Sequence, residues 1–359
     1  MIEFLARAFG GDKSGKPKGT KRINLALQGG GAHGAFTWGV LDHLLDDGRL
    51  TVEGISGTSA GAVNAVMLAD GLKRGGPAEA RKRLADFWRA ASLGGDLPAV
   101  QRAVTDRLFS LLPSEGSFNW LAAWSQYLSP YDVNPLNLNP LKDMIERFVD
   151  FEGLRADSRQ IYIAATNVQT GRLHIFPHDK ISAEAVMASA CLPAVFRAVE
   201  IDGVPYWDGG YLGNPVLYPF FRSTDTEDVL IVQINPLVRK KVPHSTRDIM
   251  HRVNEITFNA PLMAELRAIE FVNRLIDQGR LPHGTGDNEY RRINVHRIVL
   301  EGLGERFSSA GKLRNDYESF ELLRKLGQRA ARRFLDGHYD DIGVRSSVDL
   351  KTEVYSERG

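Results

Sequence analysis

Cysteine is almost absent from this chain, whose 359 residues include one, Cys191. A single cysteine excludes an internal disulfide framework and favours a reducing compartment. Cys191 lies among apolar neighbours in "MASACLPAVF", which is typical of a small buried thiol rather than of a nucleophile. We therefore look for reactive chemistry elsewhere in the sequence.

The sequence also lacks a strong charge of one sign and a long apolar run. Lys and Arg number 45 against 44 Asp and Glu, so no global field attracts the chain to nucleic acid or to a membrane. No stretch reaches the roughly 18 consecutive apolar residues of a spanning helix. The N-terminal stretch carries its basic cluster after its apolar residues, the reverse of a signal peptide. We expect a cytoplasmic protein that binds no nucleic acid.

The remaining composition is that of a globular protein, with 43% hydrophobic and 25% charged residues. No linker divides the chain, and we expect one folded domain over residues 22–345. A flexible, basic segment, residues 1–21, precedes it, and a C-terminal tail, residues 346–359, follows it. Between residues 93 and 140 the sequence is irregular and aromatic, which predicts short helices and loops laid over the core like a lid.

Two strand–turn–helix units open the predicted domain. In the first, the apolar run "INLALQ" is followed by three glycines and by a helical pattern that Gly48 ends. In the second, "LTVEGISG" leads into a small-residue turn and a helix predicted to end near Gly71. Two such units in succession indicate a parallel sheet with crossover helices, and hence the α/β class.

Later segments predict further strands and a helical C-terminal part. Residues 159–168 and 172–176 read as a hairpin, and residues 198–206 and 228–235 as strands. The last hundred residues are expected to be helical. One amphipathic helix there has an apolar face made of Tyr317, Phe320, Leu323, Ala330 and Phe334.

The second unit contains the pattern G-x-S-x-G, written here Gly57-Thr58-Ser59-Ala60-Gly61. In a nucleophile elbow a strand turns sharply into a helix, and the serine sits at the strained apex with its hydroxyl exposed. The flanking glycines leave room for the neighbouring chain. The N-terminus of the following helix would favour negative charge developing at Ser59.

The glycines of the first unit allow two interpretations. Gly29, Gly31 and Gly34 fit G-x-G-x-x-G, the turn that holds a dinucleotide phosphate. The same bare backbone could instead hold an oxyanion beside Ser59. The dinucleotide alternative needs an acid at the end of the second strand, and Glu53 is near that place, but the strand runs on into the serine motif.

A serine nucleophile needs a base, and Asp208 in "VPYWDGGYLGNP" is the candidate. Two glycines, Gly209 and Gly210, follow it directly, and no obvious helix buries it. Taken alone, Asp-Gly-Gly is more often a turn formed by local hydrogen bonds. The serine and glycine motifs that precede Asp208 strengthen its interpretation as a catalytic base.

Together these motifs resemble the patatin-like phospholipases over about residues 22 to 236. The resemblance rests on the loop from Gly29 to Gly34, on Ser59, on Asp208 and on the segment "ASACLPAVF". It implies a three-layer α/β/α fold with a mostly parallel central sheet. It also implies a Ser–Asp dyad that cleaves lipid esters as a phospholipase A or lysophospholipase does. No metal or cofactor is expected, since the aspartate, cysteine and histidine positions form no ligand cluster.

The resemblance further implies that Gly29, Gly30 and Gly31 donate hydrogen bonds to the oxyanion. One neighbouring position departs from the family, because His33 stands where the loop usually carries Arg or Lys. A neutral histidine would contribute little charge near pH 7. We expect His33 to be a packing or capping residue and not a catalytic base.

A Ser-Asp-His triad of the α/β-hydrolase type is the main alternative, since five histidines follow Asp208 in the permitted order. None lies in a convincing glycine-rich loop, and two of them, His251 and His338, fit helical positions. The five are His244, His251, His283, His296 and His338.

Peripheral membrane contact is expected from two segments, each with an alternative. The N-terminal 22 residues carry six basic and two acidic residues, a net +4, which suits anionic lipid but equally a disordered tail. The aromatic segment suits an interfacial or acyl-binding lid, or a second hydrophobic layer over the core. Its aromatic residues include Phe109, Phe118, Trp120, Trp124, Tyr127 and Tyr131.

Overall fold

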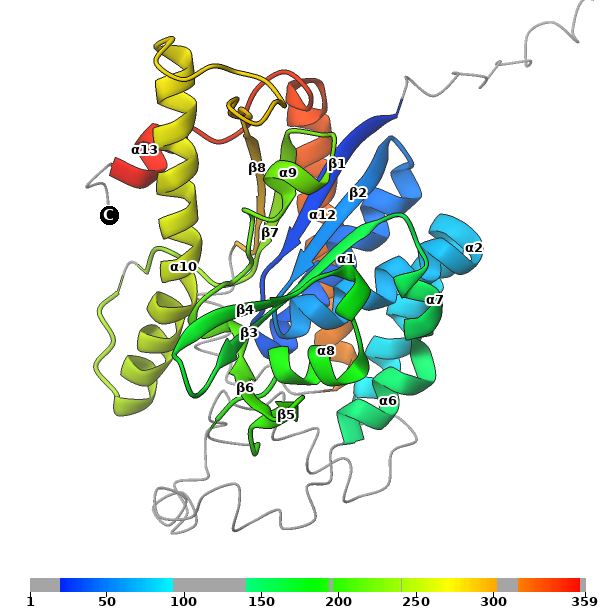
Figure 1. The fold of residues 1–359 in the computed structure, drawn as a ribbon. Coiled ribbons are helices and arrows are strands. Elements are labelled where there is room, and N and C mark those ends of the chain that lie inside the picture. The colour runs from blue at the N-terminus through cyan, green and yellow to red at the C-terminus, as the bar shows by residue number, and fades with distance from the viewer. Residues whose placement is uncertain (1–19, 93–139, 194–195, 240, 302–315, 356–359) are drawn as a thin grey trace, which may run out of the picture.

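A computed structural model describes residues 20–92, 140–193, 196–239, 241–301 and 316–355 (Figure 1). These residues form one eight-stranded sheet flanked by helices. The strands are β1 (Lys21–Leu27), β2 (Leu50–Gly57), β3 (Gln160–Asn167), β4 (Arg172–Phe176), β5 (Val199–Ile201), β6 (Val204–Asp208), β7 (Asp228–Gln233) and β8 (Asn294–Val299). The helices are α1 (Gly34–Asp47), α2 (Ala60–Ala91), α6 (Pro140–Phe148), α7 (Phe151–Arg155), α8 (Ala183–Ser189), α9 (Phe220–Ser223), α10 (Thr246–Asp277), α12 (Tyr317–His338) and α13 (Leu350–Tyr355).

The strand order in the sheet is β5-β6-β3-β2-β1-β7-β8, and β4 also pairs with β3. Strands β1, β2, β3, β7 and β8 run parallel, whereas β4 and β6 are antiparallel to β3 and β5 is antiparallel to β6. The carboxyl ends of β1 and β2 therefore meet at one edge of the sheet. In open α/β sheets that edge is where active sites form.

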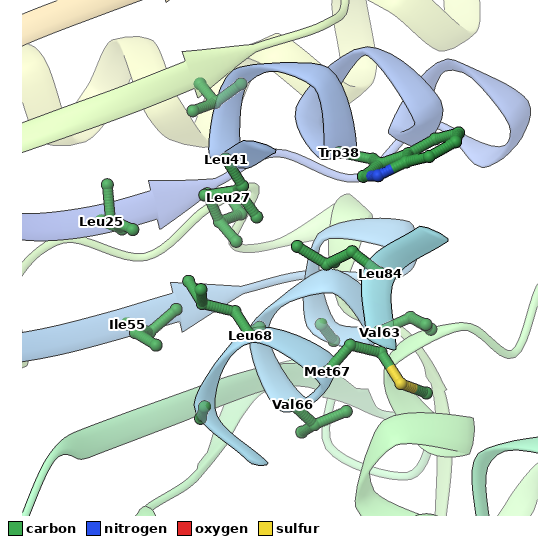
Figure 2. Close-up of a cluster of buried hydrophobic side chains, with 14 of the residues drawn as sticks. Leu25, Leu27, Trp38, Leu41, Ile55, Val63, Val66, Met67, Leu68 and Leu84 are labelled. Carbon is green, nitrogen blue, oxygen red and sulfur yellow. The ribbon is translucent and has the colours of Figure 1, made fainter. Parts of the chain in front are cut away.

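Helices cover both faces of the sheet and make three layers (Figure 1). Successive side chains of β1 alternate between the faces: Ile23, Leu25 and Leu27 belong to the larger core under α1, α2 and α12, and Ala26 to the smaller core under α10. Figure 2 shows part of the larger core, where Leu27 and Ile55 of the sheet lie beside side chains of α1 and α2. The predicted three-layer α/β/α fold with a mostly parallel sheet is confirmed.

Most predicted elements are confirmed, and two predictions are wrong. The predicted strand 198–206 is the hairpin of β5 and β6, which turns at Asp202 and Gly203 with φ values of 52° and 76°. Strand β8 lies within the last hundred residues, which were expected to be helical. The helix after the serine motif is broken at Gly75 and Gly76, whose backbone is not helical, close to the end predicted near Gly71, and a second helical stretch continues to Ala91.

Some predictions fall wholly or largely outside the described residues. The basic N-terminal segment is described only from Thr20 onward, and the aromatic segment 93–140 only at Pro140. Within the predicted C-terminal tail, α13 packs against α10. Among the described helices, none is both long enough and apolar enough to cross a membrane.

Candidate active site

Ser59 lies at the sharp turn between β2 and α2, as the motif predicts. Its backbone has φ 54° and ψ −123°, a positive φ that is strained for a residue with a side chain. Small neighbours make the turn possible, since a Cβ on Gly61 would lie 2.1 Å from the carbonyl oxygen of Leu27. The N–H of Ser59 donates to Oγ of the buried Ser189 at 2.9 Å, which fixes the apex to α8.

The glycine loop after β1 packs directly on this turn. A Cβ on Gly29 would lie 2.5 Å from the carbonyl oxygen of Thr58 and 2.7 Å from Cβ of Ser59, so only glycine allows this approach. The loop then enters a short 3-10 helix, η1 (Gly31–His33). The N–H groups of Gly30 and Gly31 donate to no acceptor in the part of the chain that the structure describes.

Gly29 itself is held on both sides by asparagine side chains. Its N–H donates to Oδ1 of Asn214 at 2.7 Å. Its carbonyl accepts from Nδ2 of Asn235 at 2.7 Å and from Nδ2 of Asn214 at 3.3 Å. The Gly29 N–H is therefore engaged, which differs from the prediction that this group faces an oxyanion.

A buried amide network extends this clamp. Oε1 of Gln28 accepts from the N–H groups of Ile234 and Asn235 at 2.9 and 2.8 Å, and Nε2 donates to Oδ1 of Asn259 at 2.9 Å. All these side-chain groups are buried and hydrogen-bonded. The network therefore ties the start of the glycine loop to the chain after β7 on one side and to α10 on the other. Sequence reasoning missed Asn214, Asn235 and Asn259; Asn214 lies in the quoted stretch after Asp208.

The sheet brings Asp208 to the same place. Residues 54–57 of β2 pair with residues 160–163 of β3, and Ala165 of β3 pairs with Asp208 at the end of β6. Asp208 is only 1% exposed, although the sequence shows no helix to bury it. Its Oδ1 accepts from the N–H of Gly210 at 2.7 Å, and its own N–H donates to the carbonyl of Cys191 at 2.8 Å.

Burial raises the pKa of Asp208 to about 7, while hydrogen bonds from the Gly210 N–H and the Ser59 hydroxyl oppose that shift. The contact between the Ser59 hydroxyl and Asp208 falls short of standard hydrogen-bond geometry. Among the described residues, Oδ2 of Asp208 accepts no hydrogen bond. Catalytic hydrogen bonds often become short only when substrate binds. The structure thus brings Ser59, Asp208 and the glycine loop together.

Comparison with known proteins gives this arrangement a family. The model of the patatin-like phospholipase family matches residues 25–220, a span that includes the glycine loop, Ser59 and Asp208. The chain belongs to this family. Membership supports lipid-ester hydrolysis as its type of activity. No curated protein is significantly similar to the chain in sequence.

Two solved structures are similar to this chain at low sequence identity. VipD from Legionella pneumophila is 15% identical over 89% of this chain and 67% of that one, with a TM-score of 0.40. A chain of the ExoU–SpcU complex from Pseudomonas aeruginosa is 17% identical over 69% of this chain, with a TM-score of 0.28. The match spans about half of that chain, 52% of its length.

His33 supplies no fixed positive charge to the loop of this patatin-like phospholipase. Loss of solvation lowers its pKa to about 4, so the ring is neutral at pH 7. Although it precedes α1 directly, its side chain makes no capping hydrogen bond. His33 therefore contributes no charge that would stabilise an anion at this loop.

Four of the residues on which the two alternative functions depend have other contacts. Glu53 accepts from the N–H groups of Asp225 and Thr226 and pairs with Arg22. No histidine of the described chain is among the groups that shift the pKa of Asp208. Of the five histidines, His244 is exposed, His251 lies in α10, and His283, His296 and His338 contact Glu227, Asp228 and Asp341 respectively.

An apolar cavity opens beside Ser59 and Gly31. The space between atoms there, including open solvent at its mouth, is about 390 Å³, and side chains of α2 and α6 form much of its wall. Those side chains are Val63, Phe87, Trp88 and Leu141. Within the described residues no cluster of three or more His, Cys, Asp or Glu could hold a metal ion.

Proposed function

We propose that this protein is a serine lipid acyl hydrolase of the phospholipase A or lysophospholipase type. The observation that carries the proposal is that Ser59, which lies on a strained turn, is close to the buried carboxyl group of Asp208, whose pKa is near 7. Two backbone N–H groups with no acceptor, those of Gly30 and Gly31, belong to the loop packed on that turn.

The reaction begins with attack of Ser59 Oγ on the ester carbonyl carbon, while the carboxylate of Asp208 takes the hydroxyl proton. The N–H groups of Gly30 and Gly31 donate to the tetrahedral oxyanion, and Gly29 holds the loop in place. When the intermediate collapses, the carbon–oxygen bond to the leaving alcohol breaks and Asp208 returns the proton to that oxygen. Water then attacks the acyl-enzyme, Asp208 takes its proton, and Ser59 recovers that proton as the fatty acid leaves.

The raised pKa of Asp208 suits this role. A carboxylate with an ordinary pKa is a weak base for a serine hydroxyl, and burial makes it stronger. The cost is that part of the enzyme carries a protonated, inactive Asp208 at neutral pH. No histidine is required as an intermediate base.

The apolar cavity supports a fatty acyl ester as the substrate class. Its walls carry aliphatic and aromatic side chains, so burying an acyl chain there is favourable by about 0.8 kcal/mol per methylene. The ester carbonyl would then lie at Ser59 and Gly31, which line the same cavity. The polar part of the lipid would remain toward the mouth.

Release of fatty acid from lipid tests this function. Purified protein is incubated with phosphatidylcholine and, separately, with lysophosphatidylcholine, and free fatty acid is measured by mass spectrometry. We expect hydrolysis by the wild type and none above background by Ser59→Ala. Absence of release from both lipids and from a soluble p-nitrophenyl ester, in protein that is folded, would contradict the proposal.

A further inference from the structure

An exposed apolar surface lies on the segment 238–256, which comprises the chain after β7 and the first turns of α10. Of the thirteen large apolar side chains that are exposed in the described residues, six lie on this short segment, with exposures from 44% to 74%. The six, which we call the α10 apolar surface, are Val238, Val242, Ile249, Met250, Val253 and Ile256.

Three of these side chains lie along one stripe of the helix. Ile249, Val253 and Ile256 are spaced by four and three residues, so they project from the same face of α10. Isolated exposed apolar residues need no explanation, but a concentration of them on one element indicates an interaction site.

The same helix continues into the active site. The Phe258 ring packs edge-on against Tyr211, which follows Asp208 in the short helix η3 (Gly209–Tyr211), with ring centroids 5.5 Å apart. One residue further, Asn259 bonds to Gln28 of the glycine loop. At 1.5 Å per residue, Ile249 lies only about 14 Å along the helix from Phe258. Figure 1 shows the start of α10 at the same end of the molecule as β5 and β6.

The segment is also locally basic, in a chain whose overall net charge is +1. Five basic residues against Asp248 and Glu255 give residues 238–256 a net charge of +3, from five minus two. Two of the five pair with Glu255, and Lys241 is exposed. The five are Arg239, Lys240, Lys241, Arg247 and Arg252.

We propose that the α10 apolar surface docks on an anionic lipid bilayer, with its aliphatic side chains at the boundary of headgroups and acyl chains. The excess of basic residues lies at 239–241, in the chain just before the helix that carries three of the aliphatic side chains. Such a combination fits a bilayer interface, because the apolar contacts and the attraction to anionic headgroups act together. This inference rests on the proposed function, since a lipid acyl hydrolase must take its substrate from an aggregate. Docking there places the end of the molecule that carries Ser59 toward the membrane.

Vesicle binding tests the docking surface without catalysis. Ser59→Ala protein is sedimented with vesicles of phosphatidylcholine and phosphatidylserine in equal parts. We expect the added changes Ile249→Ser, Val253→Ser and Ile256→Ser to weaken binding at least about tenfold. The matched control, Phe271→Ser with Leu322→Ser and Val344→Ser, removes three exposed apolar side chains outside the α10 apolar surface and should bind as the parent does.

The charge component has its own variant. Lys241→Glu should weaken binding to the phosphatidylserine vesicles, and added salt should reduce the difference from the parent protein. On vesicles of phosphatidylcholine alone the same substitution should have little effect. An equal effect on both kinds of vesicle would contradict an electrostatic role for this side chain.

Several outcomes would overturn the proposal. One is that the Ser59→Ala protein does not bind the vesicles. Another is that the control variant and the surface variant lose vesicle binding to the same extent. A dimer that only the surface variant abolishes would show that a second copy occupies the surface. A lower melting temperature of the lipid-free surface variant than of the control would show that another part of the chain covers it. Hydrolysis of a soluble ester by the wild type tests the proposed function separately, so either idea can fail alone.

Discussion

In the proposed mechanism Asp208 accepts the Ser59 proton only as a carboxylate, and burial raises the pKa of that group to about 7. The active fraction of the enzyme therefore increases as the pH rises through 7. We expect kcat/KM for a soluble p-nitrophenyl ester to rise with pH along a single titration near that value and then to level off. A rate profile between about pH 5 and pH 9 measures this; a midpoint near the ordinary pKa of aspartate, about 4, would contradict the assignment.

The same pKa has a consequence for stability. Between about pH 4 and pH 7 the folded protein holds a proton on Asp208 that the unfolded chain has lost, so the free energy of unfolding falls as the pH rises. Asp208→Asn removes this titration. We expect the wild type to lose up to about 4 kcal/mol relative to that variant over this range and no more above it.

Denaturant unfolding of both proteins at several pH values measures the difference. Other titrating groups, such as Glu265, whose pKa burial also raises to about 7, are common to both proteins and cancel. A difference in unfolding free energy that does not change with pH would show that the pKa of Asp208 is not raised on folding.

At the scale of elements, the glycine loop depends on side chains from distant parts of the chain. Asn214 bonds to both the N–H and the carbonyl of Gly29, although 185 residues separate them. It is not among the residues that line the apolar cavity beside Ser59. Its expected role is to position the loop rather than to bind substrate.

Asn214→Ala should therefore lower kcat at least about tenfold while leaving KM nearly unchanged, as expected when a contact needed only in the transition state is lost. Asn214→Asp keeps an acceptor for the Gly29 N–H and should recover part of the lost rate. Steady-state kinetics on the soluble ester separates the two constants. A rise in KM with unchanged kcat would instead place Asn214 in substrate binding.

Local signals explain which elements were predictable. Strands β1 and β4 are apolar runs bounded by turn residues, and α12 shows a clear helical period, so each was predicted from the sequence. The β5–β6 hairpin carries its own signal in Asp202-Gly203, a pair typical of two-residue hairpin turns. Strand β8 was not predicted. It contains a buried polar residue, His296, whose partner Asp228 lies 2.9 Å away on β7 and is not evident from the local sequence.

The residues of the candidate site likewise fall into those that local motifs predict and those that only the fold reveals. Ser59, Asp208 and the glycines lie in short motifs whose spacing is visible in one sequence. Ser189 and Asn235 were not predictable, since they contact the site across 130 and 206 residues and no motif marks them. The engagement of the Gly29 N–H followed only from the three-dimensional arrangement.

At the scale of the whole molecule, the sheet assembles one site from segments far apart in the sequence. Strands β1 and β2 end side by side and present the glycine loop and Ser59, while β6, antiparallel to β3, delivers Asp208 from the other direction. The helices on the two faces then close the site, with α2 forming part of the wall of the apolar cavity and α10 contacting the aspartate turn. The central claim is that Ser59 and Asp208 act as one unit without a histidine.

Activity of the single and double variants on a soluble ester tests this claim most directly. Ser59→Ala and Asp208→Asn should each remove nearly all activity, and the double variant should be scarcely worse, because residues that act as one unit are not additive. Replacing His244, His251, His283, His296 or His338 one at a time should leave most activity. If one of these variants, with the circular dichroism and melting temperature of the wild type, is as inactive as Ser59→Ala, a histidine is the base and the dyad is wrong.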